Sequence, residues 1–423
     1  MKLTIRLSAL VKIALVACPA SLFAQERIEL DSVISKARAN YPSIHQKGIL
    51  QQTEAISLQN LNKGYLPQLS LNGQATYQSD VTQINIPFPG ITVNPLSKDQ
   101  YKAAIDVEQV VFDGGLIAGQ KSLQRLSSKL ESEKIEVELQ KVKERVQQIY
   151  LTALMLDEQL KQVELMQLDL QVGYRKTEAL VKNGVSFQSN LNAMEAELLK
   201  ADQRAIELSA SRKGLINALS LFIGKELPVG VKLQVPRTMQ VVTDIVRREL
   251  SLFEKQNDVI TQQRRLLLSK SLPKASLFGQ GGYGRPGLNM LQNRFDWFYI
   301  GGIRLNWNIS NLYTFRKEKQ LADISARSLD LQKETFLLNT NIQLTQQQAE
   351  IDKLEALITT DKKIIDLREK IKNAAGAQLE NQVINASDYI REVNSEDQAR
   401  QALIIHQIQL VQAKINYSTI AGY

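Results

Sequence analysis

Long helical stretches with a heptad pattern of apolar residues constrain the fold of this chain more than any other feature. Between residues 139 and 163 the apolar positions alternate at spacings of three and four, which is the seam of a coiled coil. The seam positions there are Leu139, Val142, Val146, Ile149, Ala153, Leu156, Leu160 and Val163. The stretch 191–222 repeats the spacing, with Arg212 at one seam position. Helices of about 60 to 70 residues extend roughly 90 to 105 Å, so the sequence predicts a long rod.

The second half of the chain has a similar pattern in which one row is mostly polar. Apolar residues recur at every seventh position, namely Leu337, Leu344, Ile351, Ile358 and Ile365. The row between them holds Thr340, Gln347 and Asp361 around a single Leu354. We expect this polar row to face water or neighbouring helices.

The two halves also share the order of their motifs. Residues 185–191 align with residues 383–389, and at the same offset Gly224 meets Gly422. Each match is faint alone, but their shared order predicts an internal duplication of roughly 200 residues.

The predicted boundaries follow from this duplication. The first repeat is 25–224, with strands at about 66–80 and 100–112 and helices at about 114–184 and 187–223. The second repeat is 241–423, with strands at about 272–284 and 296–310 and helices at about 313–378 and 386–421. Between them, the linker 225–240 alternates polar and apolar residues, which predicts a strand in a collar outside the rod.

Segments of alternating apolar and polar residues precede each long helix. The clearest is 297–309, and similar segments occur at 69–77, 101–107 and 275–283. Alternation over about ten residues with aromatic residues near the ends is typical of a transmembrane β-strand, although a half-buried soluble sheet gives the same pattern. Because the four segments form two matching pairs, we predict a membrane sheet. Its lipid-facing side chains include Trp297, Tyr299, Ile303, Leu305 and Trp307.

The number of strands then predicts an oligomer. Closed outer-membrane barrels need eight or more strands, because closure leaves no unpaired edge. Four strands do not close alone, whereas three chains give twelve. The proline-containing segments 80–100 and 284–295 are expected to be loops at the outer end of the sheet.

The N-terminus reads as a secretory signal peptide, residues 1–24. Lys2, Arg6 and Lys12 accompany a short apolar run, and Ala24 provides a small residue for cleavage. A competing interpretation takes the sequence before Cys18 as a bacterial lipobox, which would make Cys18 the lipidated first residue. No later apolar run reaches 18 residues, so no transmembrane helix is expected.

Residues that carry chemistry are scarce. One cysteine and two histidines exclude disulfide scaffolds and Cys/His metal clusters, and His45 and His406 are expected to be ordinary polar positions on helices. No nucleophile–base pair or phosphate loop is present, so we expect no enzyme, cofactor or metal. The formal charge of +8 includes no basic block in the sequence, which gives no support for nucleic-acid binding.

Several motifs together resemble the TolC-like outer-membrane efflux proteins over essentially the whole mature chain. They are the strand-to-helix junction 110–116, the first hairpin tip 181–191 with its closing segment 221–224, and the second tip 380–389. The resemblance implies a mainly α fold with a small β part. Long antiparallel coiled-coil hairpins form a periplasmic α-barrel, and four strands per chain contribute to a trimeric twelve-stranded outer-membrane β-barrel.

The resemblance also implies a function and its partners. A homotrimer in the bacterial outer membrane, in contact with its lipid, would conduct substrates from an inner-membrane pump and a periplasmic adaptor protein. The implied adaptor contact and gate lie at the tips, at Gly184, Val185, Ser186, Asn190, Gln382, Asn385 and Asp388. Gln382 stands where the family usually has glycine, and Gly376 is near enough to absorb the turn. Ser186, Ser189 or Asn190 is expected to cap the next helix. The alternative is a secreted or envelope-associated coiled-coil rod.

Overall fold

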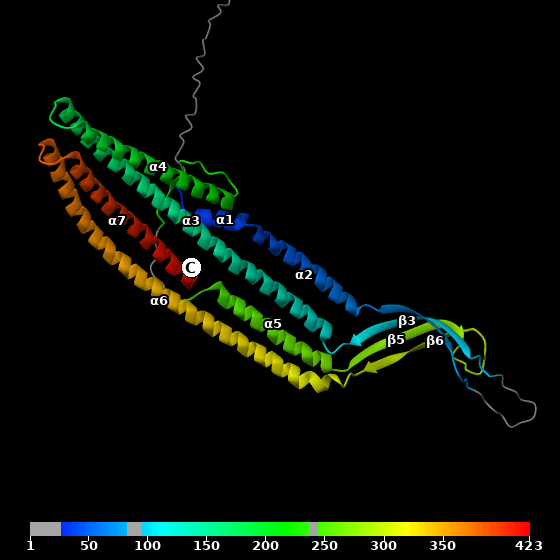
Figure 1. Ribbon diagram of the computed structural model, residues 1–423. Coiled ribbons are helices and arrows are strands. Elements are labelled where there is room, and N and C mark those ends of the chain that lie inside the picture. Colours follow the sequence, from blue (N-terminus) through cyan, green and yellow to red (C-terminus); the bar gives the residue numbers. More distant parts are fainter. Residues whose placement is uncertain (1–26, 83–94, 237–243) are drawn as a thin grey trace, which may run out of the picture.

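The computed structural model describes residues 27–82, 95–236 and 244–423. It shows an elongated molecule with long helices at one end and a small sheet at the other (Figure 1). The first half contains α1 (Leu30–Asn40), α2 (Gln46–Asn62), β2 (Gln68–Tyr77), β3 (Asp99–Phe112), α3 (Leu116–Lys182) and α4 (Gln188–Ile223). The second contains α5 (Arg248–Ser271), β5 (Lys274–Arg285), β6 (Asp296–Asn306), α6 (Asn311–Glu380) and α7 (Ala386–Ala421). The chain is therefore mainly α with a small β part, as predicted.

Two long helical hairpins form the rod, α3 with α4 and α6 with α7 (Figure 1). The predicted seam of α3 is buried: Leu139, Val146, Ala153 and Val163 have no exposed surface. On α4, Met194 and Leu219 are equally buried. The heptad pattern therefore identified the packed side of the first hairpin correctly.

The polar row of the second half faces a neighbouring helix. Thr340 and Asp361 are buried on α6, and Asp361 Oδ2 lies 2.6 Å from His406 Nδ1 of α7. His406 is thus a paired polar residue on a helix. Next to these polar residues, Ile351 and Leu354 of α6 share a buried apolar cluster with Ala413 and Tyr417 of α7.

Arg212 lies at its predicted seam position, where its guanidinium has both a carboxylate and a backbone partner. Its guanidinium pairs with Asp157 of α3 and donates to the backbone oxygen of Val231, 2.5 Å away. In its described part, 225–236, the linker that contains Val231 forms a two-residue strand, β4 (Lys232–Leu233), which pairs in parallel with β1 (Arg27–Ile28). This strand is much shorter than the linker, because Pro228 and Pro236 flank it.

Tyr150 anchors this small two-stranded sheet to α3. Its hydroxyl donates to the backbone oxygen of Ile28 at 2.6 Å and accepts from the backbone N–H of Gln234 at 2.9 Å. Burial raises the pKa of Tyr150 to about 12, so the hydroxyl keeps its proton for this bond.

The four long strands form one antiparallel sheet in the order β2-β3-β5-β6. Each half supplies one hairpin, and β3 of the first half pairs with β5 of the second. The outer strands β2 and β6 each keep one edge without a partner among the described residues. Both halves thus place a helix, a strand pair and two long helices in the same order, while the duplication itself stays a prediction.

Some predictions concern residues outside the described ranges. These are the signal peptide with Cys18, most of the first outer loop, and the end of the linker. Among the described residues, no helix combines the length and the apolar character that a membrane crossing requires.

Candidate functional surfaces: the two sheet faces and the hairpin tips

The strand register places the predicted lipid-facing residues on one continuous face of the sheet. Leu277 of β5 stands opposite Ile303 of β6, and Gly281 opposite Tyr299. The same register carries this face across β3 to β2, where Ile105 stands opposite Leu71. Large apolar side chains there are strongly exposed: Leu69, Leu71, Trp297, Tyr299, Ile303 and Leu305 are 73 to 85% exposed. A sheet of one chain therefore presents a wide apolar surface without a cover.

Trp307 does not belong to this strand face. β6 ends at Asn306, and the chain turns toward α6, which begins at Asn311. The indole of Trp307 donates to the backbone oxygen of Ser271, 3.0 Å away. The predicted alternation ran past the end of the strand because turn residues happened to continue the pattern. Trp307 instead fastens the junction of β6 and α6 to the end of α5.

The opposite face of the sheet is polar and internally bonded. Asp106 accepts hydrogen bonds from Asn72 on β2 and from Gln280 on β5, the latter at 2.5 Å. Gln280 in turn accepts from Lys102 at 2.9 Å, and Ser276 donates to Glu108 at 2.7 Å. The bonds run between neighbouring strands, so this face is well ordered and hydrophilic.

Two phenylalanines interrupt the polar face, and cations cover both. Lys102 Nζ lies 4.8 Å from the ring centre of Phe298, and the Arg304 guanidinium lies 4.5 Å from that of Phe278. Phe298 lies over Gly282, where an added Cβ would be 2.6 Å from the ring. The rings therefore fill the space above a glycine-rich strand and remain shielded from water by charged groups.

Asp113 organises the first strand-to-helix junction. Its carboxylate accepts from the backbone N–H groups of Gly115 at 2.8 Å and Ile117 at 2.7 Å. Gly114 and Gly115 have φ of 70° and 81°, and a Cβ on Gly114 would lie 2.9 Å from Leu272. The junction therefore requires glycine for both its backbone conformation and its close packing.

The first hairpin tip turns through Gly184, as predicted from its residue type. Gly184 has φ of 74°, and the N–H of Val185 donates to the carbonyl of Leu180 at 2.9 Å. This is a glycine-terminated helix end. Val185 and Phe187 are 51% and 79% exposed, which leaves two apolar side chains at the extreme end of the rod.

The expected caps of α4 are absent. The residue at the N-cap is Phe187, and no side chain caps the helix. Asn190 instead donates from its side chain to Ser186 Oγ, 3.1 Å away. The two polar side chains bond to each other, and neither accepts from a backbone N–H group at the start of α4.

The second tip makes the same turn with a residue other than glycine. Gln382 has φ of 59°, and the N–H of Val383 donates to the carbonyl of Gln378 at 2.8 Å. Gly376 does not absorb the turn, because it lies inside α6. Asn385 caps α7 by accepting from the N–H of Asp388 at 2.9 Å. Val383 is 70% exposed at the end of the rod.

A buried charge network that the sequence analysis missed connects the two hairpins near the tips. Lys372 of α6 donates to Asp169 of α3 at 2.6 Å and pairs with Glu396 of α7 at 2.7 Å. Arg400 pairs with the same Glu396 at 2.7 Å. The Glu396 side chain is 4% exposed and that of Lys372 is 12%. The sequence signal was a carboxylate at a position where the coiled-coil seam favours an apolar residue.

The network shifts both central groups toward their charged forms. Burial alone lowers the pKa of Lys372, but the bonds from Asp169 and Glu396 outweigh burial, and the pKa is raised. Burial alone raises the pKa of Glu396, but Lys372 and Arg400 outweigh it, and the pKa is lowered. Both residues are therefore ionised at neutral pH and hold α3, α6 and α7 together.

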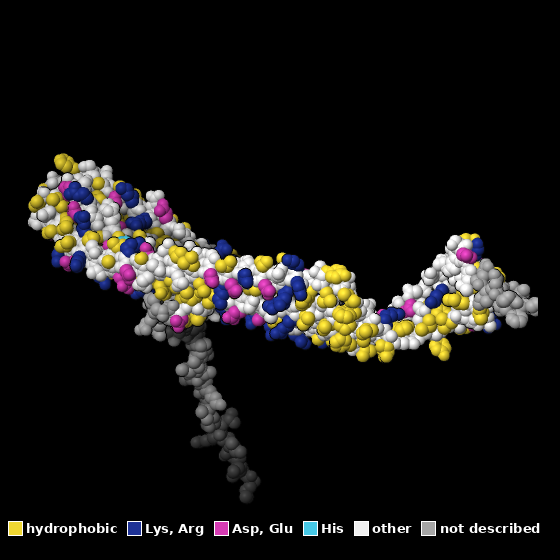
Figure 2. All heavy atoms as spheres, turned by 90° about the horizontal axis from the view of Figure 1, so that it is seen from below, with side chains coloured by type: hydrophobic (Ala, Val, Ile, Leu, Met, Phe, Trp, Pro, Cys, Tyr) yellow, Lys and Arg dark blue, Asp and Glu magenta, His cyan; other side chains and the backbone are white. Residues whose placement is uncertain are grey.

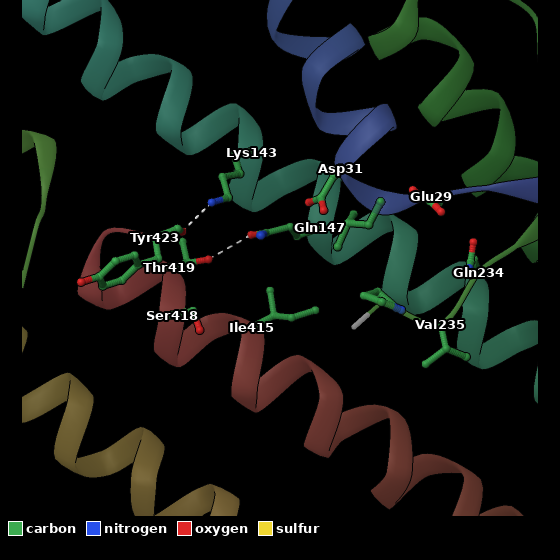
Figure 3. Close-up of a pocket in the computed structure, with 12 residues that line it drawn as sticks. Glu29, Asp31, Lys143, Gln147, Gln234, Val235, Ile415, Ser418, Thr419 and Tyr423 are labelled. Atoms are coloured by element: carbon green, nitrogen blue, oxygen red, sulfur yellow. Dashed lines mark hydrogen bonds between the residues drawn. The ribbon is translucent and has the colours of Figure 1, made fainter. Parts of the chain in front are cut away.

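A pocket of about 320 Å³ lies near the middle of the rod, between α3, α7 and the segment after β4 (Figure 3). Two hydrogen bonds join polar groups of its lining. Lys143 donates to the backbone oxygen of Tyr423 at 2.5 Å, and Thr419 donates to Gln147 at 3.3 Å. Burial lowers the pKa of Lys143. Within the described ranges no cluster of His, Cys, Asp and Glu is placed to hold a metal ion.

No protein-family model and no curated protein matches the chain. Solved structures do resemble it. The outer membrane protein VceC from Vibrio cholerae is 13% identical, with a TM-score of 0.66 over 93% of this chain and 96% of VceC. CusC, whose structures describe transmembrane channel formation, is 16% identical, with a TM-score of 0.67 over 93% of this chain and 92% of CusC.

The CmeC outer membrane channel from Campylobacter jejuni is 13% identical, with a TM-score of 0.63 over 93% of this chain and 86% of CmeC. The three proteins are channels or membrane proteins of one architecture, and the match covers both the sheet and the helical hairpins. The chain therefore has the TolC-like fold of these outer-membrane channels.

Proposed function

We propose that this chain is one protomer of a passive exit duct in the bacterial outer membrane. Three copies would close a twelve-stranded barrel, and their helices would continue it as a tunnel in the periplasm. The observation that carries the proposal is the four-stranded sheet, which has one apolar face, one polar face and two free edges. The fold similarity to outer-membrane channels supports it.

The free edges require partners of a particular kind. β2 has 10 residues and β6 has 11, so a single chain would leave two long rows of backbone donors and acceptors unpaired. Inside a bilayer such groups are too costly to leave without hydrogen bonds. Pairing β6 of one copy with β2 of the next satisfies both edges, and repetition closes the ring with the apolar face toward lipid.

A passive duct needs a pump to supply it with substrate. We propose that a periplasmic adaptor protein meets the tips and that the adaptor links the duct to an inner-membrane pump. The exposed apolar side chains Val185, Phe187 and Val383 support a protein contact there. The exported substrate is not specified by these features.

Assembly provides the first test. We expect a homotrimer when the mass of the detergent-solubilised particle is measured, because only closure removes the free edges. A stable monomer in detergent would contradict the proposal. Release into buffer without detergent, as an extended monomer or dimer, would favour the coiled-coil rod.

The tips provide a second test. We expect Ser186→Arg, Asn385→Asp and Asp388→Lys together to abolish export while trimers still form and insert. Asn385→Asp keeps the side-chain oxygen that caps α7, so the change adds charge without removing the cap. The measurement is drug or secretion sensitivity beside a trimer assay. Lys363→Glu, at an exposed position on α6, is the matched control. Export that survives the changes at both tips would place the adaptor contact elsewhere.

A further inference from the structure

Nearly all of the net positive charge of the chain lies where the helices meet the sheet. Within thirteen residues of the strands, the helical segments contain nine of the 52 basic residues and two of the 44 acidic ones. The nine residues, here called the basic band, are Lys63, Lys121, Arg125, Arg264, Arg265, Lys270, Arg316, Lys317 and Lys319. The remainder of the chain is close to neutral, so the band is a local feature.

The charges of the band are also mostly unpaired, unlike those of the rod. Along the rod, lysines and arginines pair with carboxylates again and again, as in Lys161–Glu158 and Lys182–Glu178. Among the described residues, the only ion pair of the band joins Arg264 to Asp323, at 3.1 Å. One of the two acids near the strands, Asp113, is already occupied as a helix cap. The band therefore has positive charge to offer to a partner.

Part of the band lines a groove between α5 and α6. The groove has a volume of about 420 Å³, and its lining combines three cations with apolar side chains: Thr261, Arg264, Arg265, Leu268, Phe315 and Lys319. Figure 2 shows Lys and Arg side chains gathered beside an apolar area where the helices approach the sheet. Such a surface fits a molecule with an anionic head and an apolar body.

The position of the band matches the surface of a membrane that the sheet spans. Lys270 is four residues before β5 begins at Lys274, and Lys319 is thirteen residues after β6 ends at Asn306. At 1.5 Å per helical residue, these distances correspond to about 6 to 20 Å below the strands. Long basic side chains extend further toward the membrane. Trp307 and Tyr313, which are 51% and 81% exposed, follow the end of β6 closely, where interfacial aromatic residues are expected.

We propose that the basic band binds the headgroups of anionic phospholipids in the leaflet on the helical side of the membrane. The proposal rests on the proposed function, which puts the sheet across a bilayer. A basic residue near an anionic membrane surface gains about 1 kcal/mol, and the gain falls off within a Debye length. The headgroup phosphate meets Arg265 and Lys319, while Leu268 and Phe315 contact the apolar part of the lipid. The bound lipids fix the height of the duct in the membrane.

The test uses the only two tryptophans of the chain as reporters. In a Trp297→Phe background, Trp307 is the single reporter and lies next to the band. The full-length protein is reconstituted into bilayers of phosphatidylcholine with either brominated phosphatidylglycerol or brominated phosphatidylcholine. Quenching of Trp307 then gives the relative affinity of the two lipids. The test variant carries Arg265→Gln, Arg316→Gln and Lys319→Gln, and the charge-matched control carries Lys213→Gln, Lys362→Gln and Lys363→Gln, at exposed positions on the rod.

We expect the parent to prefer phosphatidylglycerol several-fold at low salt, and the test variant to lose most of that preference. The preference should shrink as salt is added, because salt screens charges that lie more than a Debye length apart. The control should keep the preference of the parent. An unchanged preference in the test variant, no preference in the parent, or abolition of the preference by inorganic phosphate would each overturn the inference.

The same preparations separate this inference from the proposed function. Trimer mass and channel conductance report the duct, whereas the ratio of quenching by the two lipids reports the band. A conducting trimer that shows no preference for phosphatidylglycerol contradicts the inference alone. A parent protein in which brominated lipid quenches neither Trp297 nor Trp307 is not in the bilayer, which contradicts the proposed function.

Discussion

The tip between α3 and α4 and the tip between α6 and α7 reverse the chain with the same backbone hydrogen bonds, although Gly184 occupies the turn in the first and Gln382 in the second. The left-handed conformation costs a residue with a side chain roughly 1–2 kcal/mol more than glycine. At the second tip, Asn385 caps α7 and Ala386 is buried directly after it. The first tip has a glycine and no cap. Each tip thus has one favourable feature that the other lacks.

The comparison extends along both halves at the offset that aligns Val185 with Val383. At that offset Ile105 aligns with Ile303, and both lie on the same face of the sheet. Tyr174 and Leu198 align with the buried pair Lys372 and Glu396. Phe187 aligns with Asn385, which caps α7. The two halves therefore share one apolar face of the sheet but differ in how they stabilise the rod. Equivalent positions provide matched substitutions that test this difference.

The largest effect is expected on the face that the halves share. Ile303→Arg and Ile105→Arg should each destabilise the inserted sheet by up to about 2–4 kcal/mol, because each places a charge against lipid. Asn306→Arg should be milder, since Asn306 lies on the polar side of β6. The measurement is the fraction of trimer in outer-membrane extracts and its melting temperature. Equal damage from Asn306→Arg would show that the two faces are assigned wrongly.

The next effect concerns the pair Lys372 and Glu396, whose equivalents in the first half are the uncharged Tyr174 and Leu198. Lys372→Met leaves Glu396 buried with Arg400 as its remaining partner, so the loss should be below the about 3–5 kcal/mol of a fully broken buried pair. The double variant Lys372→Tyr/Glu396→Leu copies the first half and should recover much of this loss. Lys370→Met, at an exposed i,i+4 pair, should change the melting temperature of the rod very little. A double variant less stable than Lys372→Met would mean that charge, and not packing, is required here.

The same pair predicts a pH dependence. The folded-state pKa of Glu396 is lowered, so its contribution is present above its ordinary pKa near 4.5 and is lost as pH falls below that value. The pKa of Lys372 is raised, so its contribution is present below 10.5 and is lost as pH rises through the folded-state pKa. The melting temperature of the parent should therefore fall more steeply below about pH 4.5 than that of Glu396→Gln. Parallel curves for the two proteins would contradict this assignment.

The sequence predicted the parts of the molecule that depend on local periodicity. The heptad seam around Leu139 is buried, and the apolar residues around Ile303 share one face of the sheet, because side chains repeat with the period of the element. The error at Trp307 arose at the end of a strand, because an alternating pattern does not indicate the residue at which the strand ends. The error at the α4 cap arose because Ser186 and Asn190 bond to each other, and residue type does not indicate which of two partners is chosen.

The charge network and the turn at Gln382 depended on information that a single sequence lacks. Lys372, Asp169 and Glu396 lie on three helices that come together only in the folded rod. Gln382 adopts φ of 59° because the surrounding helix ends determine the turn. Residue propensity favours glycine there, and tertiary context overrides it.

A smaller effect is expected at the caps. Asn385→Ala removes the bond to the N–H of Asp388 and should cost about 1 kcal/mol. Phe187→Asn supplies the missing cap at the first tip and should stabilise α4 by a similar amount. Hydrogen exchange of the first-turn amides of α7 and α4 measures both changes. If Phe187→Asn leaves exchange at the first tip unchanged, the backbone there does not accept a cap, and the two tips differ in more than residue type.

The smallest effect is expected at the turn residues themselves. Gln382→Gly relieves the left-handed strain but adds freedom to the unfolded chain, so the net gain should be about 0.5–1 kcal/mol. Gly184→Gln makes the opposite exchange and should lose a similar amount, because its φ of 74° suits a side chain no better than that of Gln382. Exchange of the Val383 and Val185 amides, which close the two turns, should slow about two- to fivefold in the first variant and quicken in the second. If Gln382→Gly instead speeds exchange of the Val383 amide, the glutamine side chain makes a contact that offsets the strain. The two tips then differ in more than the conformational cost of the turn residue.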